Sequence, residues 1–389
     1  MTTPTGPGTR IGLGADLPAQ RLEAASKAGA PAPASFAVVG NGWRSGFFHR
    51  PADALPDLLR VTGVVTRSEE SAQRASQERG VPGFTSLSEM IAADRPDFVI
   101  VSVPREQAPQ VLIELVEAGI PSLVETPPAN QMDDLRALWD AVGHTDLVHV
   151  AEQYPRYPGH LARKAVIDRG LIGTPTSVQL SSTHEYHAIA VMRRLLGAGR
   201  GEVAVRSQSF GGPLVDPLTR DAWTGDEREQ PASTLLSTLD FGDSMGLYDF
   251  TSNQWHNQLR HRRIVVRGSR GEIVDDDVVW LDGPQTILEA PITRRQRGYD
   301  LDLDGYTTEY LNLGGDVLWR NPFDATRFSD EEIALADMLV TAGAWARGEG
   351  EGPYSLADGC HDQAISLAIN ASLATGQTVH VGREGWSDR

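Results

Sequence analysis

The chain has 389 residues, a formal net charge of −17 at pH 7 and one cysteine, Cys360. This length predicts a globular protein of two domains. The single cysteine excludes intrachain disulfides and cysteine-based metal clusters, and the excess of 52 acidic over 35 basic residues argues against general binding of nucleic acids or anionic membranes. No apolar stretch reaches the ~20 residues of a membrane span, so we expect a cytoplasmic protein.

The first 34 residues differ in composition from the rest of the chain. They are rich in proline, glycine, alanine and threonine, and they offer too few large apolar side chains to bury a core. We therefore expect residues 1–34 to form a flexible arm that is mobile or wraps around a partner.

Residues 35–153 alternate between short apolar runs and helical stretches. Helix 68–79 is expected to begin at Ser68 as N-cap, with Glu69 and Glu70 in its first turn. Strands alternating with ten-residue helices are typical of a doubly wound parallel sheet, the Rossmann architecture. The expected strands are 36–39, 59–65, 97–103, 122–125 and 147–150, and the other helices are 107–118 and 132–142.

Residues 154–389 predict an α+β domain with a large, mainly antiparallel open sheet. Helices are expected at 161–169 and 188–196, with an extended segment at 176–182 between them. The final helices, 331–347 and 356–375, are expected to pack back on the first domain. The expected strands of the sheet are 233–241, 246–253, 262–267, 271–274, 278–281 and 286–288, while residues 207–230 read as an irregular specificity loop.

A glycine-rich turn follows the first expected strand directly. It reads Gly40-Asn41-Gly42-Trp43-Arg44-Ser45-Gly46, with Ser45 at the usual place of the third glycine. In a dinucleotide site these small residues make the turn, admit the pyrophosphate and let helix and strand pack closely. We expect a cofactor turn here, and an ordinary loop is the alternative.

The end of the second expected strand bears on the choice between NAD and NADP. An acid at this place binds the ribose hydroxyls of NAD, whereas an arginine suits the 2′-phosphate of NADP. The sequence here is Val65-Thr66-Arg67-Ser68, without an acid. We expect NADP or NAD as cofactor, with Thr66 and Arg67 favouring NADP.

The chain from Phe36 to Val381 resembles the glucose-fructose oxidoreductase, inositol dehydrogenase and MocA (Gfo/Idh/MocA) family. The resemblance rests on the order and spacing of the glycine turn and of five further motifs, at 99–104, 125–128, 152–157, 170–173 and 187–197. It implies an NAD(P)-binding Rossmann domain, a C-terminal sheet that mediates oligomers, and hydride transfer on sugars, inositols or related polyols. The cofactor-binding residues expected on these grounds are Gly40, Gly42, Trp43, Arg44, Ser45, Thr66, Arg67, Ser102, Pro104, Glu125 and Gln153.

The sequence departs from the family at its catalytic positions. Thr126 stands where the family has the lysine of Glu-Lys-Pro, and the chain has only two lysines, Lys27 and Lys164. The family's aspartates around the motif histidine are replaced by Thr183 and Ala190. The motif histidine itself is retained as His187.

Oxidation of an alcohol needs a base for the hydroxyl proton, and a histidine can serve at neutral pH. Losing a preorganised cation at the reacting oxygen typically costs on the order of 10²–10³ in rate. The reaction could therefore be weakened, rerouted through His184 or Tyr186, or absent. The catalytic candidates are His187, His184, Tyr186 and Thr126, and the alternative for residues 184–187 is a structural loop that enters a helix.

Three further residues are candidate substrate contacts. Tyr154 and Tyr157 follow the last strand of the first domain, where they could line the cleft or serve only in packing. His361 lies in the final helix, which in the resembling family can reach the cleft. Cys360 is expected to be a small buried residue.

These observations favour an NAD(P)-dependent oxidoreductase acting on a hydroxyl or keto group of a sugar, glycoside or cyclitol, with His187 as acid or base. One alternative is a cofactor-containing lyase, hydratase or glycoside-cleaving enzyme without net redox. Another is a catalytically inactive, cofactor-binding partner subunit. We expect a homo-oligomer, dimer or tetramer, formed through the C-terminal sheet, and no metal, nucleic acid or membrane partner.

Overall fold

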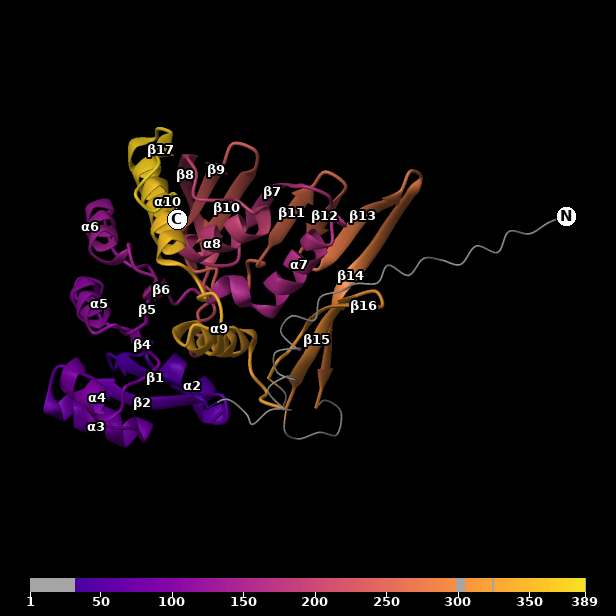
Figure 1. The fold of residues 1–389 in the computed structure, drawn as a ribbon. Coiled ribbons are helices and arrows are strands. Elements are labelled where there is room, and N and C mark those ends of the chain that lie inside the picture. The colour runs from indigo at the N-terminus through magenta and orange to yellow at the C-terminus, as the bar shows by residue number, and fades with distance from the viewer. Residues whose placement is uncertain (1–31, 299–304, 324, 389) are drawn as a thin grey trace. The chain divides into compact units, whose positions relative to one another are not determined.

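The computed structural model of the chain describes residues 32–298, 305–323 and 325–388. Nearly all of the expected arm, residues 1–31, lies outside the described residues (Figure 1). Within these ranges no helix is both long and apolar enough to cross a membrane. The same ranges contain no group of three or more His, Cys, Asp or Glu side chains suited to hold a metal ion.

The first half of the described chain contains a six-stranded parallel sheet. Its strands lie in the order β3-β2-β1-β4-β5-β6. This confirms the predicted Rossmann architecture, because the order reverses between β1 and β4, which creates a crevice at the carboxyl ends of the strands. The strands are β1 Ala34–Val39, β2 Leu59–Val65, β3 Gly83–Phe84, β4 Phe98–Val101, β5 Ser122–Val124 and β6 Val148–Val150, and the helices are α2 Gly46–Ala54, α3 Glu69–Arg79, α4 Leu87–Ala93, α5 Ala108–Glu117 and α6 Met132–Val142.

Alternate residues of the central strands point to opposite faces of this sheet. Phe36 and Val38 of β1 belong to the core cluster that contains residues of α2 and α9 (Asp330–Ala346). Ala37 and Val39 belong to the cluster that contains residues of α5 and α6. The near-continuous apolar runs of the sequence arise because both faces of the sheet are covered.

Helix α3 begins as the sequence predicts. The Ser68 hydroxyl accepts a hydrogen bond from the Ser71 N–H at 3.3 Å, with Glu69 and Glu70 in the first turn. The helix ends at Gly80, whose left-handed φ of 68° suits glycine. These end signals place α3 so that its first turn follows the carboxyl end of β2.

The second sheet has eleven strands in the order β16-β15-β14-β13-β12-β11-β7-β10-β9-β8-β17. It is mainly antiparallel, as predicted, although β7 and β10 pair in parallel. The strands are β7 Pro175–Leu180, β8 Val203–Val215, β9 Glu229–Asp240, β10 Met245–Thr251, β11 Ile264–Gly268, β12 Gly271–Val274, β13 Asp277–Gly283, β14 Thr286–Arg297, β15 Thr307–Leu313, β16 Asp316–Arg320 and β17 Val379–Val381.

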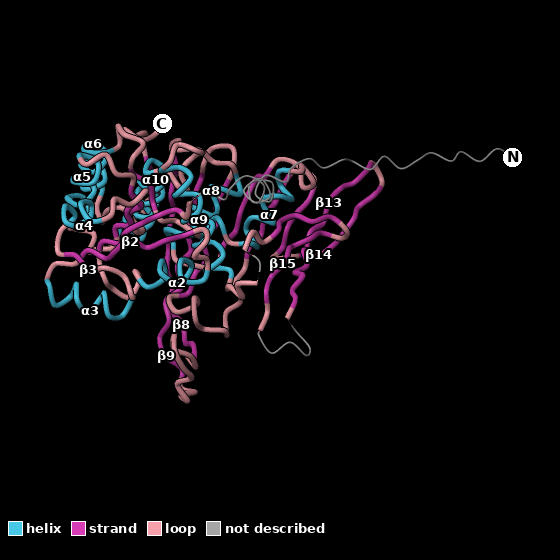
Figure 2. Tube along the Cα trace, turned by 60° about the horizontal axis from the view of Figure 1, so that its bottom comes forward, coloured by secondary structure: helices cyan, strands magenta, loops and turns pink. Residues whose placement is uncertain are grey.

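The prediction of an irregular segment over 207–230 is wrong for its first part, 207–215, and for its last two residues. Residues up to Val215 belong to β8, which pairs with β9 from Ala204↔Asp240 to Val215↔Glu229. This stretch lacks a clean apolar alternation because it contains Gly211, Gly212 and Pro213, but the partner strand supplies its backbone hydrogen bonds. Figure 2 shows the end of the β8–β9 hairpin projecting beyond the neighbouring strands, so only residues 216–228 form a loop.

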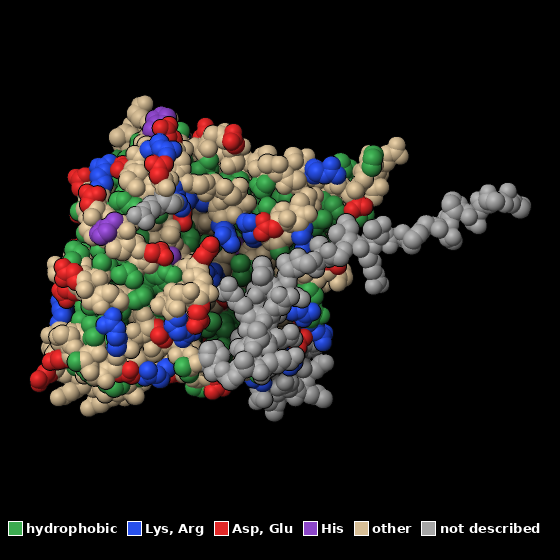
Figure 3. Space-filling view, viewed as in Figure 1, with side chains coloured by type: hydrophobic (Ala, Val, Ile, Leu, Met, Phe, Trp, Pro, Cys, Tyr) green, Lys and Arg blue, Asp and Glu red, His purple; other side chains and the backbone are tan. Residues whose placement is uncertain are grey.

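Helices cover one face of the large sheet, and α7, α8 and α10 lie in front of it in Figure 1. Along β10, Gly246, Tyr248 and Phe250 are buried while Met245 is exposed, so the other face is more open. The face of the molecule in Figure 3 mixes acidic and basic side chains. The helices that follow β6 are the 3₁₀ turn η1 Tyr154–Arg156, α7 Pro158–Asp168, α8 Glu185–Leu196, α9 Asp330–Ala346 and α10 Leu356–Thr375.

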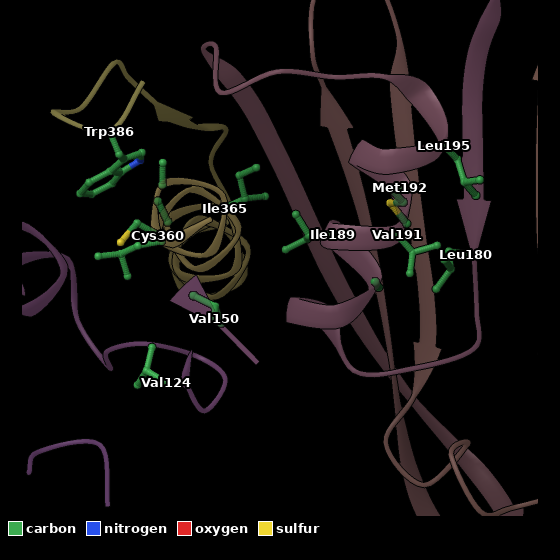
Figure 4. Packing of buried hydrophobic residues seen from close by; sticks show 14 of the residues in the cluster. Val124, Val150, Leu180, Ile189, Val191, Met192, Leu195, Cys360, Ile365 and Trp386 are labelled. Atoms are coloured by element: carbon green, nitrogen blue, oxygen red, sulfur yellow. The ribbon is translucent and has the colours of Figure 1, made fainter. Parts of the chain in front are cut away.

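One core cluster extends from the parallel sheet through α10 and α8 to the large sheet. Figure 4 shows members of it, among them Val150 of β6, Cys360 of α10 and Ile189 of α8. Cys360 is fully buried, which confirms the expectation of a small core residue. The two sheets therefore share buried apolar surface.

Four histidines among the described residues are buried with an unpartnered ring nitrogen, His149 and three whose pKa values are strongly lowered. His49 Nε2, His160 Nδ1 and both ring nitrogens of His361 have no partner among the described residues. Burial, together with the nearby charge of an arginine in each case, lowers the pKa of His49 to about 4 and the pKa values of His160 and His361 to about 3. These rings are therefore neutral in the folded protein above about pH 4.

We expect acid to destabilise the protein well above the pH at which most carboxylates titrate. Unfolded histidines bind protons near pH ~6.5, while the buried ones do not, so the unfolded state binds more protons and is favoured as the pH falls. Burial raises the pKa of Asp362 to about 6, so this carboxyl binds a proton in the folded state near pH 5. This proton offsets the one that a single histidine binds only in the unfolded state. The free energy of unfolding, measured in urea, should fall by roughly 2–3 kcal/mol per pH unit around pH 5.

The variant His160→Gln should reduce this slope by roughly 1.4 kcal/mol per pH unit, because it removes one of the three groups. The variant His380→Gln is the matched control, since His380 is exposed on β17. An equal slope in wild type and His160→Gln would contradict the assignment.

Candidate active site

A groove of about 990 Å³ runs along the carboxyl ends of the parallel strands. Its walls come from the segments that follow β1, β2, β4 and β5, which is the crevice that the strand order creates. The predicted cofactor residues that line it are Gly40, Gly42, Trp43, Arg44, Thr66, Arg67, Ser102, Pro104 and Glu125.

The glycine turn fits a dinucleotide. Gly40 has a φ of +109°, and a Cβ there would lie 2.1 Å from the Ser102 carbonyl oxygen, so only glycine fits. A Cβ on Gly42 would meet no atom within 4 Å, so a ligand can approach this backbone closely. Asn41 Oδ1 is buried without a partner among the described residues, and a ribose hydroxyl could satisfy it. The residues present therefore fit a bound dinucleotide.

Two predicted cofactor residues lie elsewhere. Ser45 is fully buried and does not line the groove; its hydroxyl donates to the Gly42 carbonyl at 2.6 Å and so stabilises the turn. Gln153 lines a second groove instead. Small size at position 45 matters for the turn rather than for contact with a ligand.

The groove end next to β2 is cationic. Thr66 and Arg67 line it, together with Ser71 and Arg74 of α3, whereas Glu69 and Glu70 do not. Arg74 escaped the sequence analysis because it lies two helical turns beyond the motif. Two guanidinium groups here suit a phosphate better than ribose hydroxyls alone.

A second groove, of about 1340 Å³, adjoins the first. Both grooves are lined by Trp43, Arg44, Glu125 and Thr126, so they meet at these residues. Its other walls come from α2, η1, the N-terminal end of α8 and the segments 218–223 and 254–262. Tyr154, Tyr157, His184 and His187 line this groove.

A buried carboxylate holds His187 in place. Glu152 follows β6, is fully buried, and lies 2.6 Å through its Oε2 from His187 Nδ1. Its Oε1 accepts the Tyr154 N–H at 2.9 Å. When the carboxylate accepts a hydrogen bond from Nδ1–H, the lone pair of neutral His187 lies on Nε2, the nitrogen left for the groove. This is the pairing of a base with an orienting acid.

Aromatic rings pack along the same wall. The Tyr154 ring stacks on His187 with centroids 4.1 Å apart, and Tyr157 stacks on Tyr154 at 4.9 Å. Burial raises the pKa values of Tyr154 and Tyr157. Both phenols therefore stay protonated at neutral pH and can donate hydrogen bonds, but they do not act as bases.

The remaining candidates have different positions. His184 is the N-cap residue of α8 and lines the second groove, where burial, and then the charges of His187 and Arg220, lower its pKa. Tyr186 is buried, lies edge-on to His187 with centroids 5.6 Å apart, and does not line the second groove. His361 is fully buried in α10 and lines neither groove, because its helix face is turned into the core.

A cation lies next to the position of Thr126. Arg44 Nε is 2.8 Å from Glu125 Oε1, and its Nη1 is 3.2 Å from Glu331 Oε1. Burial alone would lower the pKa of Arg44, but the two carboxylates outweigh it and raise that pKa. The charge of Arg44 is thus fixed where the two grooves meet.

Glu152, Arg74 and Arg220 are site residues that the sequence analysis did not single out. Glu152 had a usable signal, since an acid directly after a buried parallel strand lies at the carboxyl edge of the sheet. Arg220 lies in the loop after β8, and no local pattern places it beside Trp43.

Comparison with known proteins identifies relatives of this chain. Residues 34–154 match the oxidoreductase family with an NAD-binding Rossmann fold, GFO_IDH_MocA. An uncharacterized oxidoreductase of Schizosaccharomyces pombe is 30% identical over 147 residues, which are 36% of this chain and 40% of that protein. Levoglucosan dehydrogenase of Pseudarthrobacter phenanthrenivorans is 33% identical over 129 residues, 32% of each protein. The chain thus aligns with only about a third to two-fifths of the length of these relatives.

Similarity of fold extends further than similarity of sequence. The structure of levoglucosan dehydrogenase in complex with NADH and L-sorbose covers 91% of this chain and is itself covered completely, with a TM-score of 0.64 and 20% identity. Residues 34–154 therefore match a family of NAD-binding Rossmann-fold oxidoreductases, and the chain as a whole has the two-sheet fold of levoglucosan dehydrogenase.

Proposed function

We propose that this protein is an NAD(P)-dependent oxidoreductase of the Gfo/Idh/MocA type that acts on a hydroxyl or keto group of a sugar, glycoside or cyclitol. The observation that carries the proposal is the Glu152–His187 pair, at 2.6 Å, in a groove that meets the nucleotide groove. The family match of residues 34–154 supports the cofactor, and the levoglucosan dehydrogenase relative supports a sugar-like substrate.

The nucleotide groove would hold the cofactor through its glycine turn and the segment after β2. Gly40 and Gly42 would admit the pyrophosphate, and Thr66, Arg67 and Arg74 would contact the adenosine ribose and a 2′-phosphate. Ser102, Pro104 and Glu125 would line its path toward Thr126. The bound nicotinamide would accept or donate the hydride.

His187 would move the proton. In the oxidation direction Nε2 takes the proton of the substrate hydroxyl, and in the reduction direction it returns a proton to the carbonyl oxygen. Glu152 is a positioning residue, because it holds Nδ1 and thereby the tautomer and ring orientation. Tyr154 supports the ring from one face, and Arg44 supplies positive charge beside Thr126.

Thr126 favours one second candidate function, a reaction without net redox. A neutral residue at this position leaves less stabilisation for an alkoxide, whereas the Glu152–His187 pair can equally remove a proton next to a carbonyl group. Product formation with no change in nicotinamide absorbance would select this candidate.

The variants His187→Asn and Glu152→Gln test the assignment. With a panel of sugars, glycosides and cyclitols, His187→Asn should lower kcat about 10²–10⁴-fold, since it removes the base. Glu152→Gln should lower kcat about 10²–10³-fold, because the amide no longer fixes the tautomer. Nicotinamide absorbance gives the rate, and cofactor fluorescence gives the dissociation constant.

For both variants the cofactor dissociation constant should stay close to that of the wild type, whereas the thermal midpoint of His187→Asn should fall, because one oxygen of buried Glu152 loses its partner. The variant His380→Asn, on exposed β17, is the matched control. Catalysis that survives in His187→Asn would rule out His187 as the base, and a loss of cofactor binding in Glu152→Gln would assign Glu152 a structural role.

We also expect the protein to prefer NADPH over NADH. The double variant Arg67→Gln, Arg74→Gln should weaken NADPH binding about 10²–10⁴-fold, since it removes two charge-assisted hydrogen bonds that each contribute roughly 1.5–3 kcal/mol. NADH binding should change less than about threefold, as it carries no 2′-phosphate. Titration calorimetry measures both constants.

The variant Arg60→Gln controls for charge, because Arg60 lies on β2, the strand that precedes Arg67, pairs with Asp94 and lies outside the groove. An equal loss of NADH and NADPH affinity in the double variant would contradict the preference.

A cytoplasmic location and a homo-oligomer formed through the large sheet stay predictions.

A further inference from the structure

The second groove is cationic in a strongly acidic protein. Five arginines and only three carboxylates line it, although the chain has a net charge of −17. The arginines are Arg44, Arg50, Arg220, Arg260 and Arg262, and the carboxylates are Glu125, Asp221 and Glu331.

Two of the three carboxylates in this groove already form ion pairs. Glu125 and Glu331 both pair with Arg44. The other four arginines have no carboxylate partner among the described residues, since they contact aromatic faces and backbone carbonyl groups. Four guanidinium groups therefore face one remaining carboxylate, that of Asp221.

These arginines are not explained by the cofactor. The cations of the nucleotide groove are Arg44, Arg67, Arg74 and Arg105. Arg50, Arg220, Arg260 and Arg262 line only the second groove. Their charge is thus available to whatever binds beside His187.

Arg220 is held in a way that leaves its donors free. Its guanidinium lies 4.1 Å from the ring centroid of Trp43 and 4.7 Å from that of Trp255. Stacking uses the faces of the planar group, while the N–H bonds point outward in its plane, where they can bind two oxygens of a carboxylate or phosphate at once. Trp43 belongs to the cofactor turn, so Arg220 joins that turn to the wall of the second groove.

Arg220 also lies near the proposed reacting centre. After burial and the charge of His187, its charge contributes to the lowered pKa of His184, and His184 and His187 line the same groove. The loop that carries Arg220 is fixed at its base by a bridge between Leu218 and Trp223. His187 and Arg220 therefore belong to the wall of one groove, which a single ligand can occupy.

We infer that the substrate carries an anionic group, a carboxylate or a phosphate, and that this group binds Arg220 with Arg260 and Arg262 nearby. The inference rests on the proposed function and narrows its substrate class from neutral polyols to sugar acids or sugar phosphates. Arg220 then determines specificity without taking part in proton transfer.

The test uses the full-length enzyme with bound NADPH or NADP⁺ and matched trios of neutral sugar, its aldonate and its phosphate ester. Binding is followed by quenching of NADPH fluorescence, and turnover by nicotinamide absorbance. We expect at least one anionic member to bind about tenfold or more tightly than its neutral partner. Comparing the aldonate with the phosphate ester shows which of the two anionic groups the site recognises.

The variant Arg220→Gln should raise KM and the dissociation constant for the anionic member about 10–100-fold, with kcat changed less than about threefold. Values for the neutral partner should stay within about threefold. The matched control is Arg228→Gln in the same loop, because Arg228 is exposed, pairs with Asp226 and does not line the groove.

Equal or tighter binding of neutral members, or anion binding that is unaffected by Arg220→Gln, would overturn the inference while the proposed function stands. If no member is turned over although the cofactor binds, the proposed function fails, and the binding data alone decide the inference. Absence of any anion binding to the NADPH complex would overturn it as well.

Discussion

The contact between Glu152 and His187 joins the two halves of the described structure at the candidate site. Glu152 follows the last parallel strand, and His187 lies in the first turn of a helix that packs on the large sheet. A carboxylate without solvent exposure is costly unless its oxygens are satisfied, and here one oxygen accepts the Tyr154 N–H and the other binds the imidazole. The need to satisfy this charge fixes both η1 and α8 relative to β6.

Other parts of the site depend on the same arrangement. The ring stack of His187, Tyr154 and Tyr157 follows from the course of the chain after Glu152. Helix α9, far along the sequence, completes one face of the parallel sheet and brings Glu331 to Arg44. Two carboxylates from separate elements thereby hold Arg44 at the junction of the grooves. Without these partners, an arginine on the glycine turn would not keep its charge at one position.

Much of the fold could be predicted from local patterns. Strand 59–65 and helices 132–142 and 356–375 agree with the structure residue for residue, because apolar periodicity and end signals coincide there. The pattern fails at β8, where Gly211, Gly212 and Pro213 hide a strand that only β9 makes regular. It also fails for β15, β16 and β17, which form through pairing with distant strands rather than through a strong signal of their own.

The site was harder to predict, since its chemistry depends on contacts between distant residues. The family resemblance predicts a lysine where Thr126 stands, and the chain has only two lysines. The structure nevertheless concentrates arginine around the same place, with Arg44 at the junction and Arg220 between two tryptophan rings. An arginine stays charged under all physiological conditions and binds oxyanions through paired donors, whereas it cannot exchange protons as a lysine can. Under the proposed function, the arginines around Thr126 would therefore serve recognition of charge, and proton transfer would be left to the histidine held by Glu152.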